Sequence, residues 1–323
     1  MTVLVSGGAG YIGSVLVRLL IEKGYYVKVI DNLSFGGEPI IDLLNHPRFT
    51  FIKGDVRNES DLRIAMQGVD FVAHLASIVG DPACAKEPEL AKSTNLDGSK
   101  LIYKVANEFR VKKFVFASTC SNYGKMQDPD SFVNEESELA PVSLYAQTKV
   151  EVEQFLLSQP KTNHTKPTCL RFSTVYGLSL RPRFDLTVNE FTKELALGRE
   201  LVIFGEKFWR PYCHVVDLSR SVINVIESEE VKVAFEVFNV GDTTENYQKQ
   251  MIVDEIRKHI SDIKVNYVSK AEDPRDYRVS FEKIKTRLGF SITQKVPDGI
   301  RQILQAVTDG FILNPDDQKY RNV

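Results

Sequence analysis

Tyr145 and Lys149 are the two side chains whose types and spacing best suit proton transfer in this sequence. Residues four positions apart share one face of a helix, so the phenol and the ammonium can act on the same group. A free tyrosine has a pKa of about 10, and lowering it to about 7 takes roughly 4 kcal/mol of preferential stabilisation of the phenolate. The neighbouring ammonium is one source of that stabilisation. Because such pairs also arise by chance, the rest of the sequence has to support this one.

The segment Ser-Thr-Cys-Ser-Asn-Tyr-Gly, residues 118–124, lies between an apolar run at 114–117 and Tyr145. It offers hydroxyl groups and one thiol, but no carboxylate. A serine without a base partner cannot abstract a carbon-bound proton, so the segment restricts the reactions that the chain can support.

A glycine-rich turn near the start predicts a dinucleotide site. Gly7, Gly10 and Gly13 follow the apolar run Val-Leu-Val-Ser and precede a helical pattern that ends near Lys23. Glycines at these positions allow a tight turn, close approach to a pyrophosphate and close helix packing. The next β pattern leads to Asp31, whose carboxylate can accept hydrogen bonds from a ribose 2′-hydroxyl and would repel a 2′-phosphate, so NAD is favoured over NADP. The bound nicotinamide ring would be a second positive charge near Tyr145.

Asp55 ends the following strand and is a candidate for the adenine amino group, although a helix N-cap or a solvated carboxylate fits its spacing equally well. The residues expected to bind the cofactor are Gly7, Gly10, Tyr11, Ile12, Gly13, Asp31, Asn32, Asp55, Val56, Leu75, Ala76, Ser77, Tyr145 and Lys149.

Short β-branched or aromatic runs alternate with helical patterns over the first two-thirds of the chain. This alternation predicts an α/β fold with a Rossmann-type, doubly wound parallel sheet. We expect a nucleotide-binding domain at residues 1–177, with 216–241 returning to it, and a smaller α+β substrate lobe at residues 178–323. Long helices are expected at about 87–110 and 143–158.

Composition excludes several classes of protein. The chain has 323 residues, of which 41 are basic and 43 acidic, and these are interspersed, so capture of nucleic acid or of an anionic membrane is not expected. No apolar run approaches the roughly 20 residues that span a bilayer, and no signal peptide is visible, so a cytoplasmic protein is expected. The four cysteines are widely spaced, which predicts reduced thiols and no metal site.

In the order and spacing of these motifs, the whole chain resembles the extended short-chain dehydrogenases/reductases of the NAD-dependent epimerase/dehydratase family. The matching positions are the glycine turn, Asp31, Asp55, Ser118-Thr119, Tyr123-Gly124, Tyr145, Lys149, Arg171, Arg210, Tyr212, Val215 and Asp217. The resemblance implies that Tyr145 is the acid/base for a sugar 4-hydroxyl and that Thr119 hydrogen-bonds the same hydroxyl. Lys149 would hold the nicotinamide ribose, and Asn95 would be structural.

The same resemblance implies a nucleoside diphosphate sugar as substrate. Arg210 matches an arginine that grips the diphosphate, and Arg275 matches a second one less securely; a surface salt bridge is the alternative for each. Asn189 heads a helix near which relatives hold the nucleotide. Thr174 replaces a common asparagine and is expected to make a different contact. Trp209 and His214 are expected to be structural.

Several reactions remain open at this stage. The family's 4,6-dehydratases carry Asp-Glu after the threonine, where this chain has Cys120-Ser121, which disfavours dehydration. C3 and C5 keto-sugar epimerases use a cysteine one residue later than Cys120, which is therefore either an acid/base or a small apolar filler. Reversible oxidation at C4, by a 4-epimerase or a 4-oxidoreductase, needs only Thr119, Tyr145, Lys149 and NAD.

Residues 181–192, together with Glu272-Asp273-Pro274, also resemble a bacterial subgroup that oxidises C4 of nucleotide-linked heptoses for surface polysaccharides. A non-catalytic NAD(H) sensor is the alternative from another class, and the intact Thr119, Tyr145 and Lys149 argue against it. Relatives pair two long helices of each subunit, so a homodimer is expected.

Overall fold

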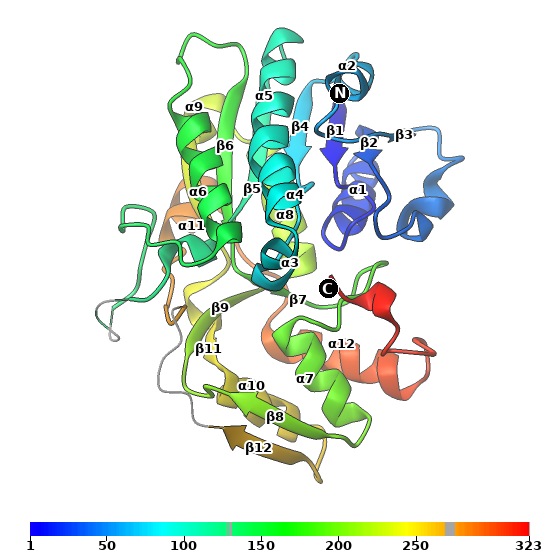
Figure 1. Ribbon diagram of the computed structural model, residues 1–323, viewed down its shortest axis with the longest axis vertical. Coiled ribbons are helices and arrows are strands. Elements are labelled where there is room, and N and C mark those ends of the chain that lie inside the picture. The colour runs from blue at the N-terminus through cyan, green and yellow to red at the C-terminus, as the bar shows by residue number, and fades with distance from the viewer. Residues whose placement is uncertain (127, 129–130, 269–274, 323) are drawn as a thin grey trace.

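The fold centres on a parallel seven-stranded sheet of order β10-β6-β5-β4-β1-β2-β3. The computed structural model describes residues 1–126, 128, 131–268 and 275–322, so Glu272-Asp273-Pro274 lie outside the described residues. Figure 1 shows the sheet in the upper part of the molecule. This confirms the predicted Rossmann-type fold. The strands are β1 (Thr2–Ser6), β2 (Tyr26–Asp31), β3 (Phe49–Lys53), β4 (Phe71–His74), β5 (Lys113–Thr119), β6 (Lys166–Phe172) and β10 (Glu236–Val240).

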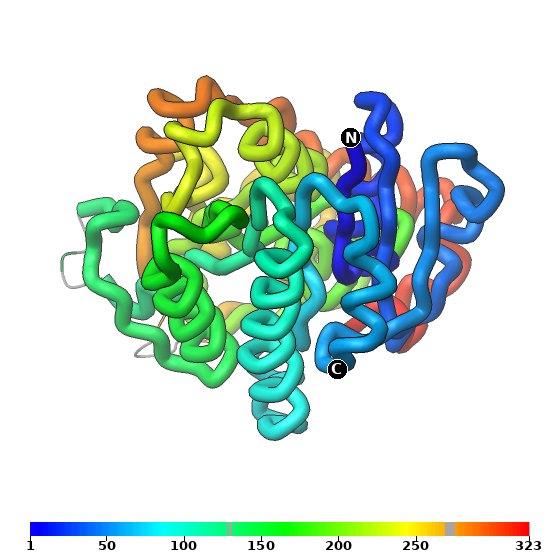
Figure 2. The backbone as a smooth tube through the Cα atoms, turned by 90° about the horizontal axis from the view of Figure 1, so that it is seen from above, coloured from blue at the N-terminus to red at the C-terminus, as the bar shows by residue number. Residues whose placement is uncertain are grey.

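Helices cover both faces of the sheet, which explains why strands such as β5 are buried along their whole length. One core packs the sheet against α1 (Gly13–Glu22), α8 (Val215–Glu227) and α11 (Glu282–Leu288). The other packs it against α2 (Glu59–Ala65), α5 (Ser99–Glu108) and α6 (Leu144–Leu157). Figure 2 shows α5 and α6 on one side of the sheet and α8 on the other.

The long helix expected at 87–110 consists of three segments in succession. These are α4 (Pro88–Lys92), the π-helical η2 (Ser93–Gly98) and α5. Asn95 lies in η2, accepts the N–H of Ile78 at 2.7 Å and donates to its carbonyl at 2.9 Å. As expected, this side chain is structural: it fixes the loop that follows β4.

A smaller lobe occupies the lower part of Figure 1. Its strands are β7 (Thr174–Tyr176), β9 (Trp209–His214) and β11 (Asn246–Gln248) in one sheet, and β8 (Glu200–Phe204) with β12 (Lys264–Val268) in another. A third core joins them to α7 (Thr187–Ala196), α10 (Lys249–Arg257) and α12 (Val296–Thr308). The lobe therefore has the mixed α+β character that the sequence predicts.

The remaining short elements lie in the segments between or after these helices and strands. They are η1 (Glu38–Leu43), α3 (Asp81–Lys86), η3 (Cys120–Tyr123), α9 (Glu230–Val233), η4 (Thr243–Glu245) and η5 (Gln318–Tyr320). Within the described ranges, no helix is long and apolar enough to cross a bilayer. The same ranges contain no group of histidine, cysteine or acidic side chains arranged for a metal ion.

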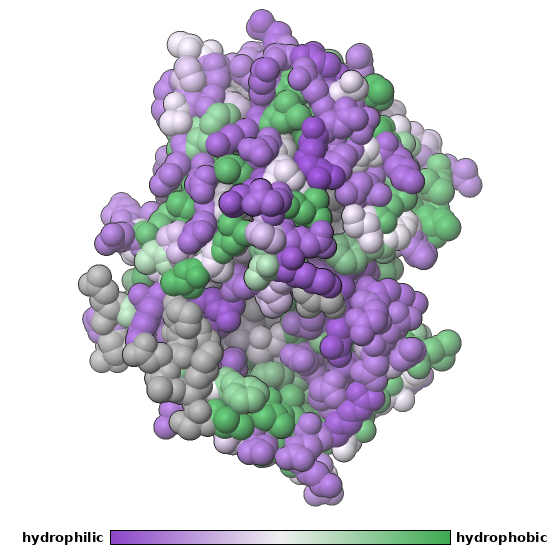
Figure 3. Space-filling model, in the orientation of Figure 1, coloured by the Kyte–Doolittle hydropathy of each residue, from purple (hydrophilic) through white to green (hydrophobic). Residues whose placement is uncertain are grey.

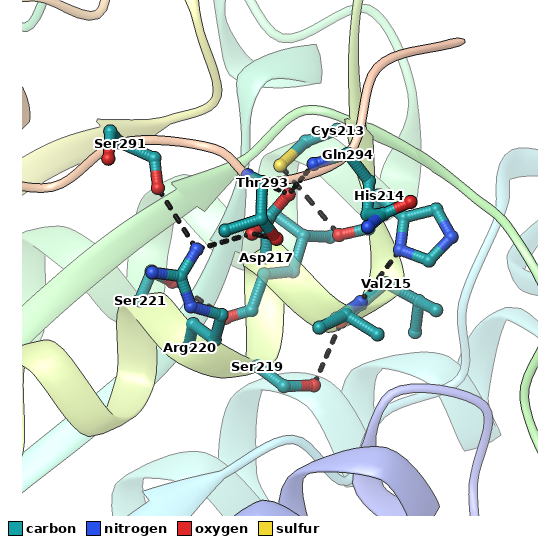
Figure 4. Close-up of polar contacts among 12 residues, drawn as sticks. Cys213, His214, Val215, Asp217, Ser219, Arg220, Ser221, Ser291, Thr293 and Gln294 are labelled. Atoms are coloured by element: carbon teal, nitrogen blue, oxygen red, sulfur yellow. Dashed lines mark hydrogen bonds and ion pairs between the residues drawn. The ribbon is translucent and has the colours of Figure 1, made fainter. Parts of the chain in front are cut away.

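The chain crosses from the lobe back to the sheet along α8 and β10. Asp217 on α8 is fully buried, and its carboxylate accepts the backbone N–H groups of Thr293 and Gln294, each at 2.9 Å. Arg220 pairs with the same carboxylate at 2.6 Å (Figure 4). These contacts tie α8 to the segment that leads into α12.

Candidate active site

A cavity of about 720 Å³ lies at the carboxyl ends of the central strands and faces the smaller lobe. In the space-filling view the molecule is hollowed between its two parts (Figure 3). All of the residues expected to bind the cofactor line this cavity, as do Thr119, Thr174, Arg210 and Arg275. The structure thus brings together in one place residues that are spread over most of the chain, which is the usual location of ligands in doubly wound folds.

The glycine turn fits the diphosphate of a dinucleotide. Gly7 has a φ of +77°, a conformation that strains any residue with a side chain. A Cβ at Gly13 would lie 2.1 Å from the Gly7 carbonyl oxygen and 2.7 Å from the Gly8 Cα. Because the turn cannot hold side chains there, the first N–H groups of α1 stay accessible to an anion.

Asp31 and Asp55 line the end of the cavity near the glycine turn, and their surroundings shift their pKa values in opposite directions. Asp31 accepts the N–H groups of Ala9 at 3.0 Å and Leu33 at 2.9 Å, which orient its carboxylate. Burial raises the pKa of Asp31 and these N–H groups oppose that rise. The Asp55 carboxylate is engaged by Arg57 at 2.6 and 2.9 Å, which lowers the pKa of Asp55.

The N-cap of α2 is Asn58, so the helix-cap interpretation of Asp55 does not apply. Contact between Asp55 and adenine remains a prediction.

Helix α6 positions the reacting pair. It begins after Ser143, whose hydroxyl accepts the N–H of Ala146 at 3.3 Å. Lys149 is 3% exposed and donates to the Ala117 carbonyl at 2.9 Å. Its Nζ lies 5.7 Å from the ring centroid of Tyr145. The expected shared face of the helix is therefore present.

Burial acts on both members of this pair. It lowers the pKa of Lys149 to about 8 and raises the pKa of Tyr145 above its usual range. The apolar surroundings alone therefore shift Tyr145 away from the value that a base needs at neutral pH.

A buried ion pair supports the turn after β5. Arg171 and Glu153 have side chains that are 5% and 2% exposed and meet at 2.8 Å. Glu153 also accepts hydrogen bonds from Ser118 and from Asn122, the latter at 2.9 Å. Thr119, directly after Ser118, caps η3 by accepting the Ser121 N–H at 3.1 Å, and its hydroxyl hydrogen remains available to a ligand. The turn after β5 is thus fixed against α6 by the hydrogen bonds to Glu153.

Two predicted site residues do not line the cavity. Cys120 is 1% exposed and its Sγ donates to the Arg171 carbonyl at 3.2 Å, while Ser121 faces the cavity. Burial raises the pKa of the Cys120 thiol. Asn189 is buried in α7 and bonds Gly177 and the Arg183 carbonyl, so it shapes a loop, whereas Thr187 lines the cavity. Their expected roles as catalytic and substrate-binding groups gain no support from these positions.

The substrate end of the cavity is basic. Arg275 forms an ion pair with Asp81 at 2.9 Å, which joins α3 to the lobe side of the cavity. The guanidinium carbon of Arg210 lies 5.4 Å from the ring centroid of Tyr277. Both arginines line this part of the cavity, and their contact with a diphosphate remains a prediction.

His214 and Trp209 have structural surroundings, as expected. The His214 Nδ1 accepts the Val216 N–H at 3.3 Å and so caps α8 (Figure 4). Trp209 packs beneath the Arg278 guanidinium, whose carbon is 5.1 Å from a ring centroid of the indole.

Among the residues of the cavity wall that were not anticipated as site residues are Phe35, Arg181 and Asn322. They lie in three segments that are far apart in the sequence. Of these three, only Arg181 carried a signal, since a basic residue between Leu180 and Pro182 is unusual in a buried loop. Nothing in the local sequence around Asn322 indicates contact with a nucleotide site.

The fold and this site define a dinucleotide-binding enzyme of the extended Rossmann type. The model of the NAD dependent epimerase/dehydratase family matches residues 3–241, and the chain belongs to that family. It is an enzyme, and its cofactor is NAD.

Curated relatives include a UDP-glucose 4-epimerase of Lactobacillus helveticus, 28% identical over 90% of this chain and 92% of the relative. A dTDP-glucose 4,6-dehydratase of Streptomyces niveus is 26% identical over 96% of this chain and 93% of the relative. Among solved structures, a UDP-glucuronic acid 4-epimerase from Bacillus cereus, in complex with UDP-glucuronic acid and NAD, is 27% identical with a TM-score of 0.85. The match covers 96% of this chain and 99% of that one. The similarity thus extends through both the sheet and the smaller lobe.

Proposed function

We propose that this enzyme reversibly oxidises C4 of a nucleoside diphosphate sugar, as a 4-epimerase or a 4-oxidoreductase. The observation that carries the proposal is that Thr119, Tyr145 and Lys149 line the same cavity as the glycine turn and Asp31. A site of this composition can hold a dinucleotide and a sugar hydroxyl together. Support also comes from relatives and solved neighbours that are named as 4-epimerases.

The three side chains have distinct roles in this proposal. Tyr145 takes the proton of the 4-hydroxyl and later returns it, while Thr119 hydrogen-bonds the same oxygen. Lys149 holds the nicotinamide ribose and stabilises the phenolate of Tyr145. NAD, held by the residues of the glycine turn and Asp31, would supply a hydride acceptor for C4 and a positive charge in addition to that of Lys149. These positive charges must offset the burial that raises the pKa of Tyr145.

The basic end of the cavity supports a diphosphate-linked substrate. Arg210 and Arg275 are proposed to hold the diphosphate, with Thr174 and Thr187 nearby in the wall. Solved neighbours contain UDP-glucose or UDP-glucuronic acid, so UDP-sugars are the first candidates. A homodimer through α5 and α6 and a role in surface-polysaccharide synthesis belong to the same proposal, and the chemistry at C4 does not depend on them.

Dehydration is less well supported than C4 oxidation. The cavity-facing residue after Thr119 and the buried Cys120 is Ser121, which cannot act as a carboxylate acid or base. Among the described residues, the acidic side chains that line the cavity are Asp31, Asp55, Asp81 and Glu87. The first two lie at the nucleotide end, and Asp81 is paired with Arg275.

The test is to incubate the purified enzyme with a panel of UDP-, dTDP-, GDP- and CDP-sugars and to analyse products by NMR and bound NADH by absorbance. A C4 epimer without accumulated NADH identifies an epimerase, and accumulated NADH identifies a dehydrogenase. Loss of water would overturn the proposal, and no turnover of any sugar would favour a sensor. Tyr145→Phe should retain NAD binding and lose turnover by about 10²- to 10⁴-fold, the usual contribution of general acid–base catalysis.

A further inference from the structure

The segment 177–183 of the smaller lobe is fastened to the glycine turn. The Tyr11 hydroxyl, which belongs to that turn, donates to the Gly177 carbonyl and accepts the Asn189 amide at 3.2 Å. The same amide donates to the Arg183 carbonyl at 2.8 Å. Asn189 therefore holds both ends of the segment close to the place where the dinucleotide diphosphate would sit.

This segment brings two arginines into the cavity wall, and their charges are balanced differently. Arg183 forms a two-pronged ion pair with Asp185 at 2.7 and 3.0 Å. Arg181 is 6% exposed, and no described carboxylate forms an ion pair with it. Its Nε has no hydrogen-bond partner among the described residues. The carboxylates of Asp185 and Asp31 act on its charge without forming an ion pair with it. A buried guanidinium that lacks a direct ion pair is costly, so its position favours a further anion beside it.

The direction of the Arg181 side chain is also fixed. Its guanidinium carbon lies 3.7 Å from the ring centroid of Phe35, in the loop after β2. On its other edge, Nη2 donates to the Asn322 side chain at 2.8 Å and to the Arg321 carbonyl at 3.2 Å. Asn322 in turn donates to the Val79 carbonyl at 3.4 Å, in the loop after β4. The guanidinium is thus held between the loop after β2 and residues 321–322, which contact the loop after β4.

We propose that Arg181 binds the diphosphate of the dinucleotide cofactor from the side opposite the glycine turn. The turn offers backbone N–H groups to one side of the diphosphate and Arg181 offers a planar cation to the other. A 2′-phosphate is disfavoured as the anion because Asp31 stands at the ribose end. Burial and the like charge of Arg183 lower the pKa of Arg181 to about 10, and the charges of Asp185 and Asp31 only partly oppose this shift.

The proposal concerns binding and does not depend on chemistry at C4. It is tested by titrating the full-length protein with NAD, with ADP-ribose and with adenosine in a calorimeter. Arg181→Gln should weaken NAD and ADP-ribose by about 10- to 100-fold, the usual effect of losing a charge-assisted hydrogen bond, and leave adenosine unchanged. Arg257→Gln on α10, an exposed arginine paired with Asp254, is the matched control and should leave all three affinities unchanged.

Two further variants protect the test against a folding defect. Arg181→Lys keeps the charge without the planar fork and should give an intermediate loss, and Asn322→Ala should weaken the same two ligands by a smaller factor. Added salt should lower the NAD affinity of wild type more steeply than it lowers the NAD affinity of Arg181→Gln. Unchanged NAD and ADP-ribose affinities in Arg181→Gln would overturn the proposal. So would an equal loss for adenosine, or a loss confined to NADP.

Discussion

Replacing the buried Lys149 by methionine should change how stability depends on pH. The pKa of Lys149 is about 8 in the folded protein, against a usual value of 10.5, because burial disfavours its charged form. The unfolded chain therefore binds this proton more tightly, and protonation costs the folded state on the order of 3 kcal/mol at pH 7. The sign follows directly: stability rises as the pH increases from 8 towards 10.5, where the unfolded chain also loses the proton.

Between pH 7 and pH 9.5 the free energy of unfolding of wild type should rise by about 2 kcal/mol relative to Lys149→Met. Packing and the lost hydrogen bond to Ala117 do not depend on pH and drop out of this comparison. The groups that face Lys149, namely Cys84, Glu153, Tyr145 and His74, are present in both proteins.

The assay is urea unfolding of nucleotide-free protein, followed by circular dichroism at several pH values. Lys112→Met is the control, because it removes an exposed ammonium that pairs with Asp70 instead of a buried one. A constant difference between wild type and Lys149→Met, or one that moves against wild type as the pH rises, would refute the reasoning.

Two other substitutions test the glycine turn and the buried ion pair that support the site. Gly13→Ala places a Cβ against the Gly7 carbonyl and the Gly8 Cα and should weaken NAD binding by about 10- to 100-fold, measured by calorimetry; unchanged affinity would show that the turn is not the diphosphate site. Glu153→Gln leaves the Arg171 cation buried without its partner and should lower the free energy of unfolding by about 3–5 kcal/mol, an effect that a second change, Arg171→Met, should partly reverse. A loss below about 0.5 kcal/mol in the single variant would mean that the pair is not a strong constraint.

The sequence predicts well those features that a short stretch determines by itself. The parallel sheet follows from the alternation of apolar strands and helices, and it is confirmed. The glycine turn leading into α1, and Tyr145 with Lys149 on one face of α6, depend on spacing within a single element. The glycine turn, Tyr145 and Lys149 line one cavity because the carboxyl ends of parallel strands meet at one edge of the sheet.

The direction of a side chain at the end of a strand is harder to predict. Cys120 and Ser121 are neighbours, and only the η3 turn decides that the thiol points towards β6 while the hydroxyl faces the cavity. Asn189 is a polar residue in an amphipathic helix, and its burial depends on partners at Tyr11 and Gly177.

Apart from the charge of Arg181, contacts between distant segments left no local signal. Arg181 and Asn322 reach the nucleotide end because the chain folds back across α7 and α12. The segment before Asn322 is fastened there by the ion pair of Asp316 with Lys193 at 2.9 Å and by the Tyr320 carbonyl, which accepts the Phe184 N–H at 2.9 Å. Such a path is a property of the whole topology, and no spacing rule predicts it.

Strand β10 is synthesised well after its partner strand β6, and this delay affects folding. It pairs with β6 at the edge of the sheet, yet β7, α7, β8 and β9 of the smaller lobe come between the two strands in the chain. Until residues 236–240 have left the ribosome, the unpaired N–H and C=O groups of β6 form an open edge that can pair with another chain. A fragment that ends at Gly177 would keep that edge permanently, and we expect it to aggregate even though it contains the whole glycine turn and the Tyr145 and Lys149 pair.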